Sequence, residues 1–285
     1  MTNTADYEPQ ATLADREASG AVAIVTGGGS GIGAATAQAL TAAGWSIAIC
    51  GRRADALERV ADATGAHPIV TDTTDKGAVA RLVESTVTRF GRLDGLVLNA
   101  GVVRPGPVGE LSDSDWAAMV ETNLTGPYRL LHSALPHLVR NGGAVVGVSS
   151  VSGLRASGGT PGYNATKAGL NMLLQSVAVD YGPQGVRANV VCPGWTRTEM
   201  ADEEMAELGG ERGLDAEQAY RLASALVPLP RPAHAAEVAA TIAWLLSRAA
   251  SYVNAAVLPV DGGHSAVDVG TVALDPRFSL AVSMS

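Results

Sequence analysis

The sequence predicts one α/β domain in which helices cover both faces of a doubly wound parallel β-sheet. Short apolar runs of strand length alternate along the chain with longer segments of helical composition, as in successive βαβ units. The first apolar run leads directly into a glycine-rich turn. The chain has 285 residues, 47% of them hydrophobic, with no internal repeat and no second-domain boundary, so we expect one large core.

The expected strands are continuous apolar runs, because a strand that is buried on both faces has no polar side. They cover residues 21–25, 46–50, 67–70, 93–98, 144–148, 187–191 and 256–260. The expected helices cover residues 33–43, 54–63, 76–89, 114–139 (interrupted), 165–181 and 235–247. Gly44 suits the end of the first helix, since glycine readily adopts the left-handed conformation found there.

Two terminal segments fall outside this alternation. Residues 1–20 are polar and are expected to form a flexible lead before the main domain, which spans residues 21–265. Residues 266–285 form a tail whose apolar side chains would pack on a neighbouring subunit. The alternative for this tail is a poorly ordered end, as is common at chain termini.

Charge and composition argue against several functional classes. The net charge of −8 disfavours a nucleic-acid or anionic-membrane surface, which needs a basic patch. No apolar run reaches membrane-spanning length, and the first twenty residues lack the apolar core of a signal peptide, so we expect a cytoplasmic protein. Cys50 and Cys192 end apolar runs and are expected to be buried thiols, with a disulfide as the weaker alternative. The five histidines lack zinc-ligand spacing, so no metal site is predicted.

The turn from Thr26 to Gly33 carries five glycines between the first strand and the first helix. Glycines permit a tight turn and a close approach of the backbone to a pyrophosphate, and the helix N-terminus offers free N–H donors. An ordinary glycine-rich turn is the alternative, but the strand–turn–helix context favours dinucleotide binding. The residues predicted to line this part of the site are Gly27, Ser30, Gly31, Ile32 and Gly33.

The end of the second strand indicates which dinucleotide is bound. An acidic residue there would bind the ribose diol of NAD, but this chain has Gly51 followed by Arg52 and Arg53. A guanidinium can hold the 2′-phosphate of NADP through charge-assisted hydrogen bonds. Solvated surface charge is the alternative for both arginines. The sequence therefore favours NADP(H), with NAD(H) still possible.

Tyr163 and Lys167 stand one helical turn apart, so their side chains are expected on one face of a helix. A phenol is a poor acid–base catalyst at neutral pH because its usual pKa is about 10. The positive charge of Lys167 is expected to lower the pKa of Tyr163 and fit the phenol for proton exchange with an alcohol or carbonyl oxygen. The pair alone is a weak motif, because a surface tyrosine and a solvated lysine would give the same spacing.

Further motifs follow the other strands, and together they resemble the short-chain dehydrogenase/reductase family in order and spacing, over roughly residues 21–263. The family has a single Rossmann-type domain and transfers hydride between a nicotinamide cofactor and an alcohol or carbonyl. Its members include 3-oxoacyl-carrier-protein reductases and carbonyl reductases, and many are homotetramers. The matching positions are Thr26-Gly27-x-x-x-Gly31-x-Gly33, Asp72, Asn99-Ala100-Gly101, Asn123, Ser150, Tyr163-x-x-x-Lys167, Pro193-Gly194 and Val260-Asp261-Gly262-Gly263.

The resemblance implies a catalytic role for four residues. Tyr163 would be the general acid in reduction and the general base in oxidation, and Lys167 would lower its pKa. Ser150 would bind the substrate oxygen, and Asn123 would hold a water in a proton relay. Single-residue alternatives exist, such as a loop serine that caps a helix or an asparagine that kinks one.

The resemblance also distributes the cofactor contacts. Asp72 and Thr73 would lie at the adenine, and Asn99, Ala100 and Gly101 would line the adenosine side. Tyr163 and Lys167 would contact the nicotinamide side. The residues expected around the carboxamide follow the sixth strand: Pro193, Gly194, Thr196 and Thr198.

Residues 199–231 are expected to form a mobile helical lid over a small-molecule substrate. Gly209, Gly210 and Gly213 would offer hinge positions. The acids of this segment are expected to face water; they are Asp202, Glu203, Glu204 and Glu207. The small and apolar residues elsewhere around the expected pocket suit a ketone or a 3-oxoacyl group without choosing between them.

The sequence thus favours an NADPH-dependent carbonyl reductase, reversible as an alcohol dehydrogenase, that forms a homotetramer or homodimer. An NAD-dependent alcohol or sugar dehydrogenase of the same fold is the first alternative. A non-catalytic NADP-binding regulator is more distant, because such a protein has no need of the four catalytic residues together. A dehydratase or epimerase usually needs a larger substrate domain than this chain offers.

Overall fold

A computed structural model gives the fold for residues 20–210, 212–268 and 270–271, and the description below is confined to these residues. The lead expected over residues 1–20 and the tail expected over 266–285 lie almost entirely outside them. The described part of the chain contains no helix long and apolar enough to cross a membrane.

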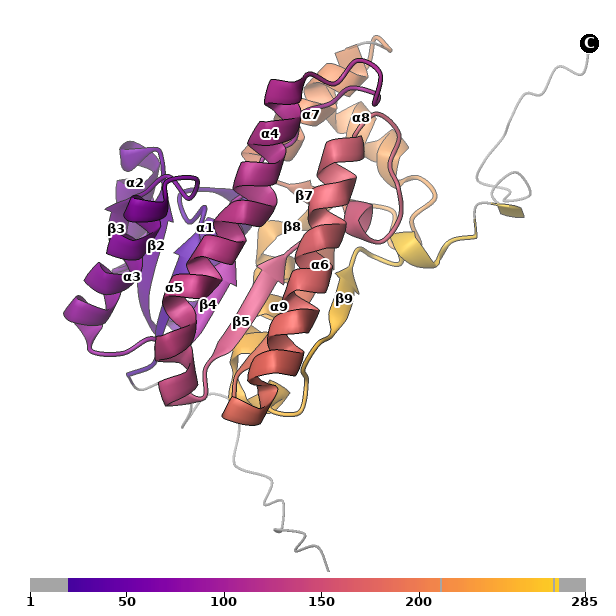
Figure 1. Cartoon of the computed structure of the whole chain (residues 1–285). Coiled ribbons are helices and arrows are strands. Elements are labelled where there is room, and N and C mark those ends of the chain that lie inside the picture. Colours follow the sequence, from indigo (N-terminus) through magenta and orange to yellow (C-terminus); the bar gives the residue numbers. More distant parts are fainter. Residues whose placement is uncertain (1–19, 211, 269, 272–285) are drawn as a thin grey trace, which may run out of the picture.

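Seven parallel strands form the central sheet in the order β3-β2-β1-β4-β5-β6-β9, which confirms the predicted doubly wound α/β fold (Figure 1). Every neighbouring pair in this sheet is parallel. The strands are β1 (Val22–Thr26), β2 (Ser46–Gly51), β3 (His67–Val70), β4 (Gly95–Leu98), β5 (Ala144–Val148), β6 (Arg187–Pro193) and β9 (Val257–Val260).

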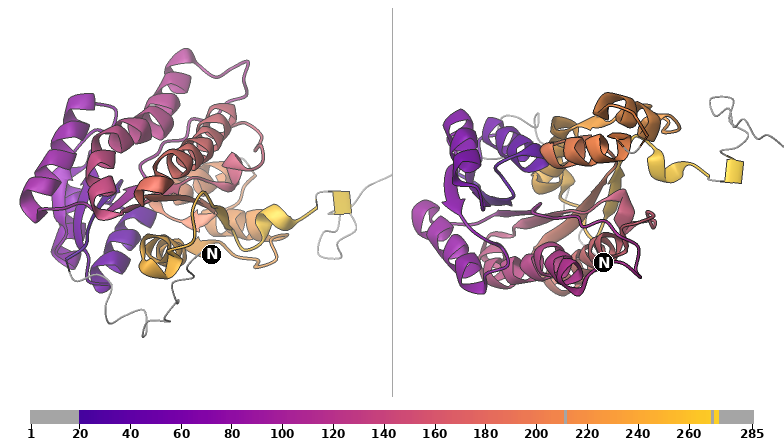
Figure 2. Two further views of the ribbon diagram at one scale, coloured as in Figure 1. Left: turned by 60° about the horizontal axis from the view of Figure 1, so that its bottom comes forward. Right: turned by 90° about the horizontal axis from the view of Figure 1, so that it is seen from above.

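Helices cover both faces of the sheet, so that the sheet is the middle layer of three (Figure 2). One face carries α1 (Gly31–Ala42), α2 (Ala54–Thr64) and α9 (Ala235–Leu246). The opposite face carries α3 (Lys76–Phe90), α5 (Gly126–Asn141) and α6 (Pro161–Tyr181). The helix α4 (Asp113–Val120) continues the line of α5 beyond the carboxyl ends of the strands (Figure 1).

The alternation of side chains along each strand divides the apolar core in two. In β1, Val22 and Ile24 pack toward α3, α5 and α6, whereas Ala23 and Val25 pack toward α1, α2 and α9. All four are buried, as expected for a strand with helices on both sides. This double burial explains why the strands read as uninterrupted apolar runs in the sequence.

Three local features differ from the sequence prediction. The helix expected from residue 165 begins at Pro161, a favoured first helical residue, so Tyr163 lies in its first turn. The interruption in the fourth predicted helix is a π-helical turn over Glu121–Thr125, between α4 and α5. A second sheet of two short parallel strands, β7 (Thr196–Arg197) and β8 (Ala233–His234), was not predicted.

The segment expected to be a lid contains two helices, α7 (Glu199–Gly210) and α8 (Ala216–Ser224). They lie beyond the carboxyl ends of the strands, at the top of the molecule in Figure 1. They share a small apolar cluster of their own, made by Ala201, Met205, Ala219 and Tyr220, with Trp195 packed against it. This segment is therefore a packed helix pair.

Candidate active site

The predicted site residues converge on one edge of the sheet. They follow the carboxyl ends of β1 to β6 or lie in the helical segments that come after β4 and β5, at the edge where open α/β sheets bind ligands. The strand order reverses at β1, which pairs with β2 on one side and β4 on the other. The site therefore lies at the topological switch point of the fold.

The glycine turn after β1 is held in a tight shape by Asn99, which follows β4. The Nδ2 atom of Asn99 donates to the carbonyl oxygens of Thr26 and Gly27 at 2.9 and 3.3 Å. The Thr26 hydroxyl accepts from the backbone N–H groups of Asn99 and Ala100 at 2.9 and 3.0 Å. A Cβ atom on Gly33 would lie 2.2 Å from the Gly27 carbonyl oxygen, so only glycine permits this packing.

The turn has the features that a pyrophosphate requires. Gly27 and Gly31 have positive φ angles of 64° and 52°, and Ser30 precedes α1 without its side chain capping the helix. The first N–H groups of α1 thus remain available to an anion. A Cβ atom on Gly31 would lie 2.9 Å from the Thr198 methyl group, so the segment after β6 borders the turn. Ile32 packs into the core beneath it. These residues fit a nicotinamide dinucleotide.

Asn123 links the loop after β4 to helix α6. Its side chain is 1% exposed and lies in the π-helical turn. The amide accepts from the Val102 N–H and donates to the Val102 carbonyl, each at 2.8 Å, and also donates to the Thr166 hydroxyl at 3.2 Å. Thr166 in turn donates to the Tyr163 carbonyl at 2.9 Å. Asn123 therefore fixes the position of the helical turn that carries Tyr163.

Lys167 is buried on the same helix. Its Nζ atom donates to the Val148 carbonyl at the end of β5 at 2.8 Å, and a Cβ atom on Gly101 would lie 3.4 Å from Nζ. Burial lowers the pKa of Lys167 to about 8, because desolvation disfavours the charged form. The nearby Cys192 opposes this shift of the lysine pKa.

Tyr163 is half-buried, and its pKa is raised rather than lowered. Burial raises the pKa of Tyr163 to about 12, while a hydrogen bond with the Ser150 side chain acts to lower it and the charge of Glu204 acts to raise it. The Lys167 Nζ atom lies 5.4 Å from the centre of the phenol ring. In the cofactor-free protein burial is therefore the main cause of the Tyr163 pKa shift, and the predicted lowering of this pKa by Lys167 stays a prediction.

Ser150 occupies the second position after β5. Its hydroxyl accepts from the Ser152 N–H at 3.1 Å and caps a short 3₁₀ turn over Val151–Gly153. The same side chain reaches Tyr163, so Ser150, Tyr163, Lys167 and Asn123 form one connected group. The structure thus brings together all four residues that the sequence singled out for catalysis.

The predicted adenine contacts lie after β3. The Asp72 carboxylate accepts from the Thr74 N–H and hydroxyl at 2.9 and 2.8 Å. These bonds, and the charge of Arg52, hold the pKa of Asp72 below its usual range. Thr73 is buried, and its carbonyl packs close to Gly126 at the start of α5.

Arg53, two positions beyond the end of β2, has a partner that the sequence did not indicate. Its Nη2 atom donates to the Glu199 carboxylate at 2.6 Å and to the Ser30 hydroxyl at 3.3 Å. The hydrogen bond and charge of Glu199 raise the pKa of Arg53. No sequence signal could have revealed this pair, because 146 positions separate Arg53 from Glu199.

The residues after β6 form the opposite wall of the site. Gly194 N–H donates to the Val260 carbonyl at 3.2 Å, next to Pro193, the last residue of β6. The Thr196 hydroxyl donates to the Gly194 carbonyl at 3.1 Å, and Thr198 accepts from the Ala201 N–H at 3.2 Å. These hydrogen bonds thus fix the position of the segment between β6 and α7.

The acids of the lid do not all face water as expected. Asp202, Glu203 and Glu207 are exposed as expected, and the Asp202 carboxylate also accepts from the Tyr220 hydroxyl at 2.8 Å. Glu204 is half-buried, and burial raises its pKa.

Arg197 helps to hold α8 in place. Its guanidinium lies 4.2 Å from the centre of the Tyr220 ring and forms an ion pair with Glu217. Gly209 is buried against the Leu214 carbonyl, where a Cβ atom would lie 2.8 Å away, so it serves close packing.

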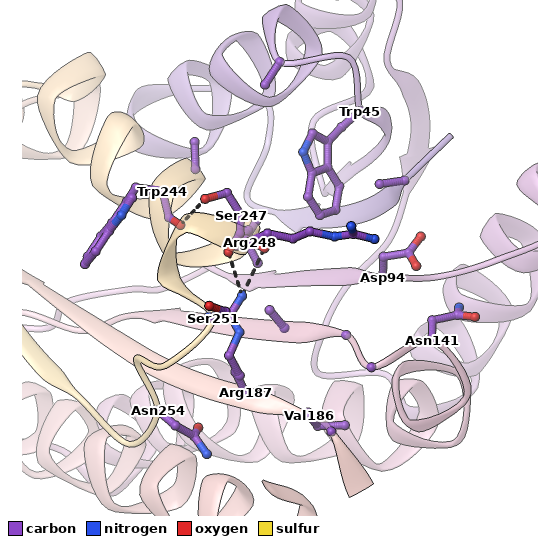
Figure 3. Close-up of a pocket in the computed structure, with 18 of the residues that line it drawn as sticks. Trp45, Asp94, Asn141, Val186, Arg187, Trp244, Ser247, Arg248, Ser251 and Asn254 are labelled. Atoms are coloured by element: carbon purple, nitrogen blue, oxygen red, sulfur yellow. Dashed lines mark hydrogen bonds between the residues drawn. The ribbon is translucent and has the colours of Figure 1, made fainter. Parts of the chain in front are cut away.

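A separate cavity of about 970 Å³ lies at the amino ends of the strands (Figure 3). Trp45, Asp94, Arg187 and Arg248 contribute to its lining, and no predicted site residue does. Arg187 donates to the carbonyl oxygens of Leu245, Leu246 and Ser247, and so secures the end of α9. This cavity is distinct from the site described above.

Within the described residues, no group of three or more His, Cys, Asp or Glu side chains is placed to hold a metal ion.

Comparisons with known proteins agree with the fold and the motifs. A family profile described as "Enoyl-(Acyl carrier protein) reductase" matches residues 27–265. Protein MoaE of Klebsiella aerogenes is 40% identical over 254 residues, which cover 88% of this chain and 98% of that protein. Cis-4-hydroxycyclohexanecarboxylate dehydrogenase of Sinomonas cyclohexanicum is 40% identical over 253 residues, covering 86% and 97%.

A solved structure gives the same picture. The crystal structure of levodione reductase aligns with a TM-score of 0.84 at 36% identity and covers 88% of this chain and 100% of its own. The levodione reductase of Leifsonia aquatica is 36% identical over 272 residues, covering 92% of this chain and 99% of that protein. Named relatives are thus dehydrogenases and reductases that act on alcohol or carbonyl groups. The protein is an oxidoreductase that belongs to the short-chain dehydrogenase/reductase family.

Proposed function

We propose that this enzyme uses NADPH to reduce a ketone or a 3-oxoacyl carbonyl to a secondary alcohol, reversibly, with Tyr163 as the general acid and base. The observation that carries this proposal is the connected group of Tyr163, Ser150, Lys167 and Asn123 at the carboxyl edge of the sheet. A protein that only bound a dinucleotide would have no use for a buried lysine beside a tyrosine and a serine.

The residues divide the chemical work between them. When bound, the nicotinamide cofactor gives or takes the hydride. In reduction, the Tyr163 hydroxyl donates a proton to the developing alkoxide, and the Ser150 hydroxyl orients the substrate oxygen. Lys167 supplies a positive charge below its pKa of about 8, which favours loss of the phenol proton. Asn123 holds the helical turn of Tyr163 in place and would position a water for reprotonation.

Two arginines support a preference for NADP(H). Arg52 and Arg53 follow β2, where the adenosine ribose is bound in this fold, and no acidic residue stands at the end of that strand. A guanidinium in this position can form charge-assisted hydrogen bonds with a 2′-phosphate. NAD(H) is the alternative cofactor, in an alcohol or sugar dehydrogenase of the same fold.

The lid and the relatives support a small substrate. The helices α7 and α8 lie beyond the carboxyl ends of the strands, and Met205 and Tyr220 pack into the apolar cluster that the two helices share. Two relatives are named for a hydroxycyclohexane carboxylate and for levodione, and both are 36–40% identical to this chain. A small ketone, or the matching secondary alcohol, is therefore the first candidate, and a 3-oxoacyl thioester is the second.

We further propose a cytoplasmic homotetramer or homodimer. The exposed apolar side chains Met172 and Val179 stand two turns apart on α6, and Tyr128 is exposed on the neighbouring α5. Such a patch suits contact with a second copy of the chain.

The test of the function is Tyr163→Phe. We expect turnover to fall by about 10²- to 10⁴-fold, because the proton donor is lost while the hydride path is unchanged. Binding of NADPH, followed by its fluorescence, should remain close to that of the wild type. Ser152→Ala, which alters a hydroxyl in the neighbouring turn, serves as the matched control. Retained turnover in Tyr163→Phe across ketones and 3-oxoacyl thioesters would refute the proposed chemistry.

A further inference from the structure

The ion pair between Arg53 and Glu199 joins two parts of the site that the sequence treats as separate. Arg53 is the N-cap residue of α2, two positions beyond β2, where the 2′-phosphate is expected, and Glu199 is the first residue of α7 in the proposed lid. The Arg53 Nη2 atom lies 2.6 Å from the Glu199 Oε2 atom, and both side chains are more than half exposed. Glu199 thus places an anionic group against the guanidinium that would receive the phosphate.

The electrostatic surroundings of Arg53 are acidic. Besides Glu199, the charges of Asp55 and Glu203 act on Arg53 and stabilise its charged form. The neighbouring Arg52 acts instead on Asp72. The two arginines are therefore not equivalent, because the positive charge of Arg53 is already paired with the carboxylate of Glu199 on α7.

We propose that Glu199 is a specificity-determining residue whose carboxylate competes with the 2′-phosphate of NADP(H) for Arg53. This inference rests on the proposed binding of the 2′-phosphate at Arg53. Glu199 then lowers the preference for the phosphorylated cofactor, and binding of that cofactor releases the first turn of α7 from Arg53.

Charge and position both support competition. A phosphate monoester carries a charge of about −1.5 to −2 at neutral pH, so it is repelled by a carboxylate at the same guanidinium. Thr198 lies against Gly31 of the glycine turn and caps the start of α7 through its bonds with Ala201 and Asp202. A displacement of Glu199 is therefore expected to move the first turn of α7.

The experiment compares two ligands that differ only in the 2′-phosphate, adenosine 2′,5′-bisphosphate and adenosine 5′-monophosphate, by titration calorimetry. Glu199→Gln should tighten binding of the bisphosphate about two- to five-fold, the range expected for an exposed ion pair, and leave the monophosphate unchanged. Glu203→Gln is the matched control, because it removes the same charge one turn further along α7 without a hydrogen bond to Arg53. It should change the bisphosphate affinity less than Glu199→Gln does.

A third variant separates this inference from the proposed cofactor preference. Arg53→Ala should weaken the bisphosphate but not the monophosphate, and Glu199→Gln should have no further effect in that background. If Arg53→Ala leaves the bisphosphate affinity unchanged, the proposed phosphate site and the inference both fail. If Arg53→Ala weakens it but Glu199→Gln weakens it too, Glu199 positions Arg53 instead of competing, and only the inference is overturned. An unchanged affinity in Glu199→Gln would overturn it as well.

A readout at the lid tests the second half of the inference. The amides of Ala201 and Asp202 are bonded to Thr198, so their hydrogen exchange reports on the first turn of α7. The bisphosphate should speed their exchange relative to the monophosphate, and the difference should vanish in Glu199→Gln. Slower exchange with the bisphosphate would contradict release of the lid.

Discussion

The proposed catalytic centre and the proposed adenosine end of the site are stabilised by different kinds of interaction. At the catalytic centre, Asn123 and Lys167 are buried, and their polar atoms bond to backbone carbonyl and N–H groups. At the adenosine end, Arg53 and Glu199 are exposed and hold each other through side chains alone. The first region is held by buried hydrogen bonds to the backbone, and the second is held by an exposed ion pair.

This difference implies that substitutions in the first region affect the stability of the fold, whereas substitutions in the second affect ligand specificity. A buried polar group that loses its partner costs far more free energy than an exposed ion pair that is broken. The catalytic centre is therefore expected to tolerate few substitutions without loss of folding. The proposed adenosine end can change its charges at little cost in stability, which suits the role proposed for it in selecting between NAD and NADP.

The largest expected effect is on stability. Asn123→Ala leaves the N–H and carbonyl groups of Val102 without their partners and removes the bond to Thr166. We expect the free energy of unfolding to fall by about 2 kcal/mol, measured by urea denaturation. Arg53→Ala is the counterpart at the adenosine end and should cost less than about 1 kcal/mol. Equal losses in the two variants would show that the two regions are not held differently.

The second prediction concerns the titration of Tyr163 in the cofactor-free protein. Its folded pKa of about 12 lies above the usual tyrosine value of about 10, so the neutral phenol contributes stability that is present below pH 10 and lost as pH rises toward 12. The difference in tyrosinate absorbance between wild type and Tyr163→Phe should therefore show no titration between pH 7 and 9.

Lys167→Met adds a control to that titration. Because the pKa of Lys167 is lowered to about 8, the amine is neutral where Tyr163 titrates, and its removal should leave the tyrosine midpoint in place. A Tyr163 midpoint below pH 9 in the wild type, shifted upward in Lys167→Met, would instead restore the role that the sequence predicts for the lysine charge.

The sequence predicted the seven strands of the central sheet and the four candidate catalytic positions that lie together in the structure, because both leave local signals. Burial on both faces produces apolar runs, and a turn that approaches a phosphate requires glycines such as Gly33. The early start of α6 at Pro161 and the π-helical turn that holds Asn123 depend on packing between distant elements. The direction of the Tyr163 pKa shift could not be predicted, because spacing along a helix says nothing about how deeply a phenol is buried. The Arg53–Glu199 pair leaves no local signal at all, since it joins the second strand to the lid.

The smallest expected effect distinguishes the two regions by their response to salt. Raising the ionic strength from about 0.1 M to about 1 M shortens the screening length from about 10 Å to about 3 Å. Exposed charges are screened far more than buried ones, so binding of adenosine 2′,5′-bisphosphate should weaken a few-fold while binding of the monophosphate changes less. The Glu199→Gln effect should shrink in parallel, because the competing carboxylate is screened by the same ions. The Tyr163 titration should hardly move, since burial rather than a neighbouring charge is the main cause of its shift. A salt response that was equal at both ends would mean that the adenosine end is more enclosed in solution than its exposed arginine and glutamate indicate.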